Sequence, residues 1–398
     1  MIADLLGEYY RWKDGEFRSR ECRIAVAVKA GVRMPDMATR LLADHVSVVG
    51  AANVLDLNCG TGVVGACVAI RMPDLSLALA DRNIVNVEAA KRVVEANAIK
   101  GAKVYFSNGT TGLPRGSPCD AVTIRLPKGR IPLLQLLWDA FNVLRSGGEC
   151  YLAGANAEGI KSAISRMEEL YGNARTLGYG AGSRVAVGVK SSDAPCLPSS
   201  FTEAVLEHSL FHEYRIGIRG RELVVKSRPG VFAYERLDEG SRCLIEHMDI
   251  AANERVLDFG CGSGVVGAVA ATLAPNGHVH LVDADCEAIR SAEETIKVNG
   301  LKNCTVVASD CGEQICGLSF DAVVTNPPFH LSHKAELSMV HQLIRDSASL
   351  LQTNGRLILV ANRTLPYEKI IERVFGRIRT MHKDSRYKVL LADHPHRG

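Results

Sequence analysis

Short apolar runs alternate with longer amphipathic segments along the chain, most clearly in the second half. Five runs there have the composition of buried strands: 255–260 (RVLDFG), 278–284 (HVHLVDA), 304–310 (CTVVASD), 320–326 (FDAVVTN) and 356–362 (RLILVAN). Helical patterns lie between them at 265–274, at 288–300 and from about residue 335 onward. Strands that alternate with helices predict a mostly parallel sheet with helices on both faces. Ligands of such sheets bind beyond the carboxyl ends of the strands, so we expect the functional residues there.

The sequence also matches itself at a distance of about 202 residues. This offset places Asp56 on Asp258, Asp81 on Asp283 and Asn97 on Asn299. A repeat of this length indicates two copies of a domain, because the units of solenoid proteins are much shorter. We therefore predict an α/β protein with two tandem Rossmann-like domains, at 1–190 and 205–398, joined by a linker at 191–204.

A glycine-rich line follows the first strand of each copy. In the second copy it contains Gly260, Gly262 and Gly264. Glycines at this place let the backbone turn sharply from strand to helix and approach a ligand closely. The motif alone fits several classes of nucleotide-binding protein and is weak evidence for any one of them.

Acidic residues at the strand ends narrow the choice among these classes of nucleotide-binding protein. Asp258 precedes the glycine line and is placed to hold a cationic amino group, whereas Asp283 ends the next strand and could accept both hydroxyls of a ribose. Asp310 follows the third strand, where it could accept from an adenine amino group. Helix capping or simple surface exposure explains any one of these acids, but explains all of them together less well.

The segment VVTNPPFH at 323–330 occurs once, in the second copy only. The side-chain carbonyl of Asn326 and the backbone carbonyl of Pro327 could accept the two hydrogens of an exocyclic amine and so orient its lone pair. Prolines stiffen the loop, and Phe329 offers a face on which a flipped-out base could stack. A dehydrogenase has no use for this arrangement. A Pro-Pro turn that merely closes a strand is the plainer alternative.

These motifs support a resemblance that covers nearly the whole chain. The second half resembles class I S-adenosylmethionine-dependent methyltransferases, through VLDFGCGSG and NPPFH. The full sequence resembles the tandem-domain ribosomal RNA guanine-N2 methyltransferases of bacterial small and large subunits. Further matching segments are 229–244, 360–376 and 386–391 in the second half and 126–162 in the first.

The resemblance implies a catalytic second domain, a degenerate first domain that binds RNA, S-adenosylmethionine as the cofactor, and ribosomal RNA or a ribosomal subunit, the small one favoured, as the partner. The residues that it assigns to the cofactor are Asp258, Gly260, Cys261, Gly262, Gly264, Asp283, Ala284, Asp310, Cys311 and Asn326. Those that it assigns to the target base are Asn326, Pro327, Pro328, Phe329 and His330.

The first copy departs from the pattern at the reaction centre. Arg125 and Lys128 stand where the second copy has Asn326 and Phe329. Arginine has only donors, so it cannot accept the hydrogens of an amine. Arg125, Lys128 and the nearby Arg130 could instead contact RNA phosphates, although a solvated loop explains them about as well.

Composition excludes few classes of protein. The net charge of +3 is nearly neutral, with a slight basic excess in residues 1–200, and does not by itself indicate nucleic acid. The twelve cysteines are scattered without zinc-ligand spacing, so we expect reduced thiols, no metal and a cytoplasmic location. The start lacks the apolar core of a signal peptide, and no apolar run is long enough to cross a membrane. We expect a monomer.

Two other functions stay open at this point. The same Asn-Pro-Pro loop suits methylation of adenine N6 or of a protein glutamine amide, although His330 and the duplicated architecture argue against both. A tandem RNA-binding protein without catalysis is the alternative from another class, and the intact NPPF segment argues against it.

Overall fold

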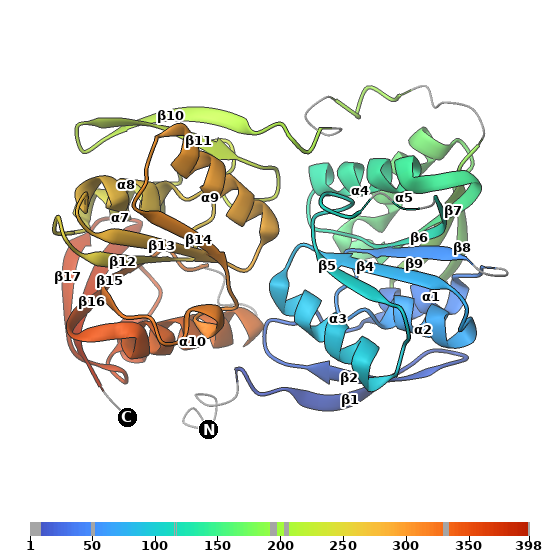
Figure 1. The fold of residues 1–398 in the computed structure, drawn as a ribbon, viewed down its shortest axis with the longest axis horizontal. Coiled ribbons are helices and arrows are strands. Elements are labelled where there is room, and N and C mark those ends of the chain that lie inside the picture. The colour runs from blue at the N-terminus through green and yellow to red at the C-terminus, as the bar shows by residue number, and fades with distance from the viewer. Residues whose placement is uncertain are drawn as a thin grey trace. The chain divides into compact units, whose positions relative to one another are not determined.

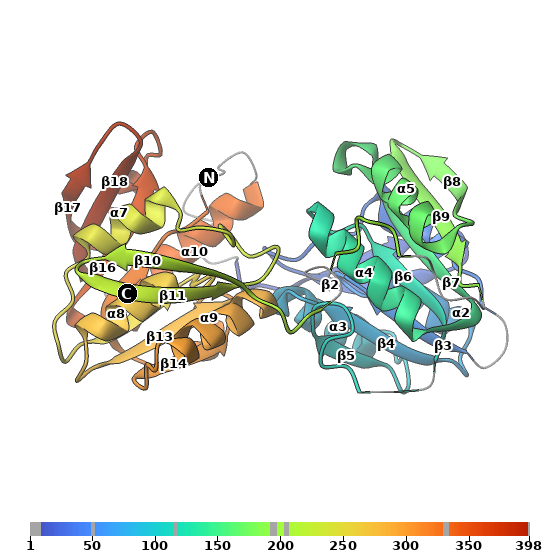
Figure 2. The same cartoon turned by 90° about the horizontal axis from the view of Figure 1, so that it is seen from above.

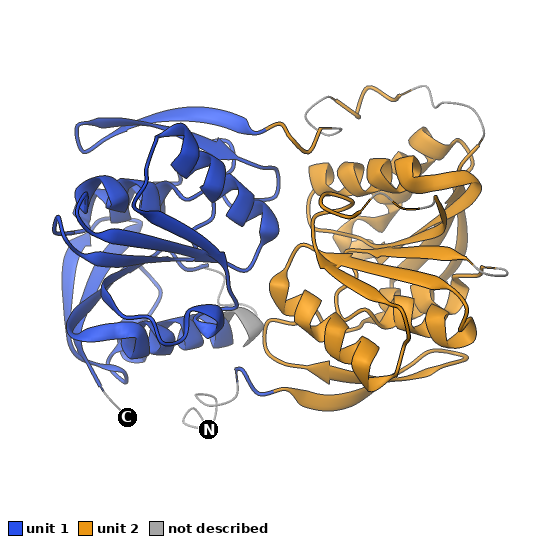
Figure 3. Cartoon of the chain, viewed as in Figure 1, with its two compact units in different colours: residues 1–11, 211–398 blue, residues 12–210 orange. Residues whose placement is uncertain are grey.

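The computed structural model describes residues 9–396, except for 49–51, 115, 117, 192–196, 203–206 and 329–333. The chain forms two compact units (Figure 3). The first domain comprises residues 12–210, and the second comprises 211–398 together with the segment that precedes residue 12. This division differs from the predicted one, which assigned the start of the chain to the first domain and began the second at 205. Half of the predicted linker at 191–204 lies outside the described residues.

Each domain is built on a mixed sheet with helices on both faces, which confirms the predicted fold class (Figures 1 and 2). The first sheet has the order β5-β4-β3-β6-β7-β9-β8. Its strands are β3 (Asn53–Leu57), β4 (Ser76–Asp81), β5 (Lys103–Phe106), β6 (Cys119–Arg125), β7 (Leu144–Ala155), β8 (Arg175–Gly180) and β9 (Ser183–Val189). Its helices are α1 (Met37–His45), α2 (Val63–Arg71), α3 (Ile84–Ala96), α4 (Arg130–Val143) and α5 (Ile160–Tyr171). The first five strands of this order are parallel, and β9 runs antiparallel to β7.

The second sheet repeats this order as β14-β13-β12-β15-β16-β18-β17. Its strands are β12 (Arg255–Phe259), β13 (His278–Asp283), β14 (Cys304–Ala308), β15 (Phe320–Thr325), β16 (Leu351–Asn362), β17 (Phe375–Lys383) and β18 (Tyr387–Pro395). Its helices are α7 (Glu239–His247), α8 (Val265–Leu273), α9 (Cys286–Val298), α10 (Lys334–Leu350) and α11 (Glu368–Ile371). The sequence pattern predicted the strands up to β16 but not the β17–β18 pair, which is antiparallel.

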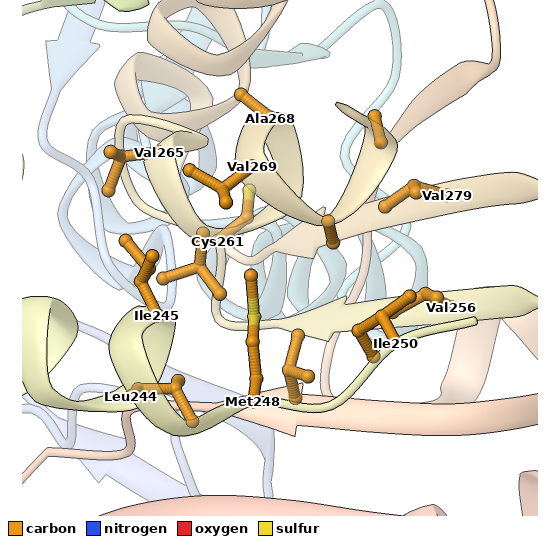
Figure 4. Close-up of a cluster of buried hydrophobic side chains, with 14 of the residues drawn as sticks. Leu244, Ile245, Met248, Ile250, Val256, Cys261, Val265, Ala268, Val269 and Val279 are labelled. Atoms are coloured by element: carbon orange, nitrogen blue, oxygen red, sulfur yellow. The ribbon is translucent and has the colours of Figure 1, made fainter. Parts of the chain in front are cut away.

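The alternation of side chains between the two faces of the central strands explains why helices cover both faces of each sheet. In β3, Val54 belongs to the apolar core on the side of α1, α2 and α3, whereas Leu55 belongs to the core beneath α4 and α5. Successive side chains of a strand point to opposite faces, so a strand such as β3, whose successive side chains are buried, must be covered on both faces. In the second domain, Val256 and Val279 pack against α7 and α8 through Met248 and Val269 (Figure 4).

A β-hairpin precedes each sheet and is fastened by the same residue in both copies. These hairpins are β1 (Lys13–Arg18) with β2 (Arg23–Val28), and β10 (His212–Ile218) with β11 (Arg221–Ser227). The amide of Asn299, at the end of α9, exchanges two hydrogen bonds of 3.0 and 2.6 Å with the backbone of Val224. Asn97 does the same with Ala25, at 2.9 and 2.8 Å. The match of Asn97 with Asn299 in the self-comparison therefore reflects a shared structural role.

Candidate active site

The described residues of the second domain that were predicted to bind ligand lie at or next to one edge of its sheet. The neighbouring parallel strands β14, β13, β12 and β15 all end there. Asp283 is the last residue of β13, Gly260 follows β12, Asp310 follows β14 and Asn326 follows β15. Parallel strands bring their carboxyl ends to the same side of a sheet, so segments far apart in sequence meet there.

The glycines of the loop after β12 serve two different purposes. Gly260, Gly262 and Gly264 all have positive φ angles, of 78°, 53° and 77°. A Cβ atom at Gly260 would meet no described atom within 4 Å, so this part of the loop has an open face. A Cβ atom at Gly264 would lie 2.9 Å from Cα of Ala292, so that glycine allows α9 to pack closely. The absence of a side chain at Gly260 therefore permits close approach of a ligand, whereas at Gly264 it is needed for the packing of α9.

Cys261 lies between these glycines, but its side chain turns away from the open face. The thiol is buried in the apolar core with Val265 and Met248 (Figure 4). Burial raises its pKa well above the ordinary range, and Asp283 and Asp258 raise it further. Any ligand contact made by Cys261 is therefore limited to its backbone.

Asp283 is anchored by the backbone on two sides. One carboxylate oxygen accepts from the N–H of Gly262 at 3.0 Å, and the other accepts from the N–H of Asp285 at 3.0 Å. Burial, and then the charge of Asp285, raise the pKa of Asp283 to about 6. The side chain is only partly buried in the folded domain, as is its neighbour Ala284. A fixed carboxylate at the edge of the glycine loop is the type of group that accepts ribose hydroxyls.

Asp258 lies beneath the loop, not on it. Its side chain is buried, and one oxygen accepts from the N–H of Gly267 in the first turn of α8, at 2.7 Å. Asp56 makes the equivalent bond to Gly65 in the first copy, at 3.1 Å. Desolvation raises the pKa of both carboxyls to about 7. This acid therefore fastens strand to helix in both copies, and its contact with a cofactor stays a prediction.

Asp310 is held by a residue from the beginning of the chain. The hydroxyl of Tyr9 donates to one oxygen of Asp310 at 2.8 Å, and both side chains are buried. The next residue, Cys311, is also buried and has a positive φ angle of 46°. Nothing in the sequence pattern connected residue 9 with this loop, since the two positions are 301 residues apart.

Asn326 is fixed by its amide nitrogen. That nitrogen donates to Oδ2 of Asp238 at 3.1 Å and to Oγ of Ser241 at 2.9 Å. Asp238 is also the N-cap of α7, because it accepts from the N–H of Ser241 at 3.0 Å. The carbonyl oxygen of Asn326 is buried and has no hydrogen-bond partner among the described residues. Buried acceptors are normally paired, so this oxygen is available for a donor from a ligand.

A second contact holds the loop that follows Asn326. The buried Tyr367 donates its hydroxyl to the carbonyl oxygen of Pro328 at 3.2 Å, while Pro327 is buried and Pro328 exposed. Phe329 and His330 lie outside the described residues, so their predicted contacts with a base stay predictions. The sequence analysis missed Asp238, Ser241 and Tyr367. Asp238 carried a detectable signal, because the first copy also has an aspartate, Asp36, at the matching position 202 residues earlier.

The first copy has replaced this amide by an ion pair. Arg125 occupies the position of Asn326, and its guanidinium contacts the carboxylates of Asp36, at 2.5 Å, and Glu158, at 2.7 Å. Asp36 caps α1 as Asp238 caps α7. Only 4% of Arg125 is exposed, so the predicted contact between this residue and RNA phosphates does not fit the structure. Lys128 and Arg130 are exposed, and their predicted RNA contacts are still compatible with it.

Arg33 covers the glycine loop of the first copy. Its backbone N–H donates to Asn86 at 3.1 Å, and its guanidinium reaches the carbonyl oxygen of Leu126 at 3.3 Å. The position of the open Gly260 is occupied in the first copy by Asn58, whose amide donates to the carbonyl oxygen of Arg125 at 2.6 Å. Asp81, the counterpart of Asp283, is fully buried. This edge is therefore more enclosed in the first copy than in the second, where Asp283 is only partly buried.

The fold also brings together three potential metal ligands that sequence spacing did not indicate. The ligand atoms of Cys243, His382 and Asp384 lie within 4.8 Å of one another, on α7 and at the end of β17. Burial, and then the charges of Asp384 and Glu246, raise the pKa of Cys243 to about 11. The expectation that the protein needs no metal stays a prediction.

Comparison with known proteins adds to this geometry. The family model of the methyltransferase small domain matches residues 28–186 and 222–391, so it matches both domains. The chain belongs to the methyltransferase small domain family. The expectation of a methyltransferase is thereby confirmed.

Among the residues that the structure describes, no helix has the length and apolar character needed to span a membrane.

Two curated members of this family illustrate the similarity. The ribosomal RNA small subunit methyltransferase C of Aliivibrio fischeri is 33% identical over 72% of this chain and 80% of its own length. That of Pseudomonas paraeruginosa is 34% identical over 69% and 79%. Among solved structures, the 16S rRNA N2 G1207 methyltransferase of T. thermophilus, in complex with AdoMet and guanosine, has a TM-score of 0.79 and 26% identity. That match covers 98% of this chain and 99% of that one.

Proposed function

We propose that this methyltransferase uses S-adenosylmethionine to methylate the exocyclic N2 amine of a guanine in small-subunit ribosomal RNA. The second domain carries the reaction. The observation that carries the proposal is the buried, unpartnered carbonyl oxygen of Asn326 at the end of β15. The names and bound ligands of the similar proteins support the same substrate and cofactor.

An exocyclic amine is a poor nucleophile because its lone pair is delocalised into the ring of the base. Asn326 counters this by accepting one amine hydrogen, and the backbone carbonyl of Pro327 accepts the other. Both acceptors are rigid, since Asp238 and Ser241 hold the amide and Tyr367 holds the loop. The hydrogen bonds strengthen as positive charge develops on the nitrogen, so they stabilise the transition state more than the ground state.

The cofactor fits the same sheet edge. S-adenosylmethionine supplies an electrophilic methyl group on its sulfonium. The open face at Gly260 permits close approach of a ligand, and the backbone-anchored carboxylate of Asp283 offers acceptors for ribose hydroxyls. Asp310 offers an acceptor to the adenine amino group. The chain therefore provides contacts for the ribose and the adenine, and room for close approach at the glycine loop, on neighbouring strands.

The first domain has a different task in this proposal. Arg33 closes its glycine loop and Arg125 replaces the acceptor amide, so it binds neither the cofactor nor a reacting base. Its exposed Lys128 and Arg130 are suited to phosphate contacts, which position RNA without reading its sequence. We further propose a monomer that acts in the cytoplasm, where ribosomal RNA is available.

The experiment combines mapping with reconstitution. Ribosomal RNA from cells with and without the gene is digested to nucleosides and analysed by mass spectrometry, and the purified protein is incubated with methyl-labelled cofactor and unmodified 16S rRNA or small subunits. We expect one N2-methylguanosine that depends on the protein. Detection of N6-methyladenosine or of a methylated glutamine would show that the proposed substrate, guanine N2, is wrong. RNA binding that does not depend on the cofactor and produces no methylation would refute the catalytic assignment.

A further inference from the structure

The first described residues of the chain belong to the second domain. Tyr9 and Tyr10 group with residues 211–398, although they precede the whole first domain (Figure 3). Their rings are packed edge to face, with centroids 5.2 Å apart. The Tyr9 side chain is 4% exposed, so this contact is part of the folded interior of the domain.

Both tyrosines hold the loop that follows β14. Tyr9 donates to Oδ1 of Asp310 at 2.8 Å. The hydroxyl of Tyr10 accepts from the N–H of Gly312 at 3.1 Å and donates to the carboxylate of Asp346 in α10. Burial raises the pKa of both phenols far above the physiological range, so both remain neutral donors.

This loop needs such support because its backbone is strained. Cys311 has a φ angle of 46°, a region that is unfavourable for residues other than glycine. Such a conformation persists only where surrounding contacts determine it. The two hydroxyls supply contacts on either side of Cys311, at Asp310 and Gly312. The direction in which the Asp310 carboxylate points is therefore determined in part by residue 9.

The corresponding segment of the second copy docks in a related way. His208 precedes hairpin β10–β11 as Tyr9 precedes β1–β2, and its ring lies 3.0 Å from the carboxylate of Asp139 in α4. Asp139 in turn accepts from the N–H of Thr110, in the loop after β5, at 3.0 Å. Each hairpin thus has a leading segment that is linked to the loop after the third strand, directly through Tyr9 in one copy and through Asp139 in the other, and this segment groups with the opposite copy. A repeated contact of this kind is a feature of the fold, and only in the second copy does it reach a predicted cofactor residue.

We propose that Tyr9 is a positioning residue that sets the specificity of the cofactor site for a purine with a 6-amino group. The inference rests on the proposed function, in which Asp310 accepts from the adenine amine. A carboxylate has only hydrogen-bond acceptors. It therefore binds a 6-amino group, which donates, and repels a 6-oxo group at the same place, which does not. Holding one oxygen through Tyr9 prevents the carboxylate from rotating away, which preserves this discrimination.

The test compares two ligands on the full-length protein by calorimetry. The ligands are S-adenosylhomocysteine and its inosine analogue, which differ at the 6-position of the purine. The wild-type protein should prefer the amino ligand by about 10- to 100-fold, the range expected for a charged hydrogen bond. Tyr9→Phe should reduce this preference roughly tenfold, chiefly by weakening binding of the amino ligand. Tyr179→Phe, which removes an exposed hydroxyl from the first domain, is the matched control and should change neither affinity.

The outcomes separate the inference from the function on which it rests. If the wild-type protein binds neither ligand, the proposed cofactor is wrong. If Asp310→Asn reduces the preference but Tyr9→Phe retains it, the role of Tyr9 is refuted while the cofactor site stands. Equal weakening of both ligands by Tyr9→Phe would show a merely structural role and would also refute the proposal. Should Tyr9→Phe fail to fold, as judged by thermal melting, the proposal is tested by Tyr10→Phe, which loosens the same loop at Gly312 and should reduce the preference as well.

Discussion

Replacement of Asn326 by aspartate tests the amide contacts most sharply, because it preserves shape and changes only charge. The amide nitrogen lies 3.1 Å from Oδ2 of Asp238. In Asn326→Asp an oxygen takes that place, so two carboxylates face each other. At an effective dielectric constant of about 20, two full charges at this distance repel by about 5 kcal/mol. That cost is large enough for the pair to keep one shared proton at pH values well above the ordinary pKa of a carboxyl group.

The retained proton makes the activity of this variant depend on pH. While the pair holds one proton, it can lie between the two side chains, and the remaining oxygen of residue 326 can still accept from the amine. As the pH rises and this proton leaves, repulsion turns the side chain away and turnover falls. The wild-type amide does not titrate. We therefore expect the ratio of variant to wild-type turnover to decrease steadily between about pH 6 and pH 9.

Single-turnover methyl transfer to unmodified RNA, normalised to the wild-type protein at each pH, measures this ratio. Asn326→Ala should reduce turnover by about 10²- to 10³-fold at every pH, because a preorganised contact is lost. The double variant Asn326→Asp with Asp238→Asn should lose the pH dependence, since the new amide can donate to the carboxylate, and asparagine still caps a helix. Wild-type turnover in Asn326→Ala, or a pH-independent ratio in Asn326→Asp, would refute the proposed role of this side chain.

Other predictions concern the buried acids and the surface cations. Asp283→Ala should weaken cofactor binding by roughly 1.5–3 kcal/mol in calorimetry, and Asp81→Ala should leave it unchanged; equal effects would contradict the assignment of the second copy as the cofactor domain. Because the pKa of Asp283 is raised to about 6 and the carboxylate form accepts from ribose, wild-type affinity should fall as the pH drops below about 6, whereas Asp283→Asn should show little such dependence. The pKa of Asp56 is about 7 in the folded protein and lower in the unfolded chain. The native state therefore binds this proton more tightly, and its contribution to stability is lost as the pH rises from about 4 to 7; thermal melting of Asp56→Asn should lack that component. Lys128→Ala with Arg130→Ala should flatten the salt dependence of RNA binding, whereas Arg125→Ala should lower the melting temperature, because it removes the buried cation that Asp36 and Glu158 share.

Much of the second sheet was predictable because its pattern is local. Apolar runs such as 255–260 and 320–326 form strands wherever they are buried on both faces, and glycines at 260, 262 and 264 specify a tight turn in any context. Parallel order then places the strand ends together without further information. The β17–β18 pair was missed because its first strand is largely exposed and carries charged residues, so it lacks the continuous apolar signal of a buried strand.

The roles of individual polar residues depended on contacts that no local spacing encodes. Sequence reasoning placed Asp258 on the cofactor and Arg125 on RNA, because a charged residue near a strand end suggests a ligand. In the fold, Asp258 accepts from the N–H of Gly267 beneath the loop, which the sequence did not indicate, and its cofactor contact stays a prediction. Arg125 is buried against Asp36 instead of facing RNA. Burial makes an unpaired charge costly, so each of these side chains is held by a partner inside the protein.

The sequence by itself determined the duplicated α/β architecture, the strand-end edge and the residue types gathered there, since these follow from apolar periodicity and from the offset between the copies. Only the tertiary structure decided which oxygen of that edge is available for a donor. Asn326 is oriented by Asp238 and Ser241, more than 80 residues earlier, and Asp310 by Tyr9, at the far end of the chain. Hydrogen bonds across such distances form after the sheet has brought their partners together, so they appear in the folded geometry and leave no pattern along the chain.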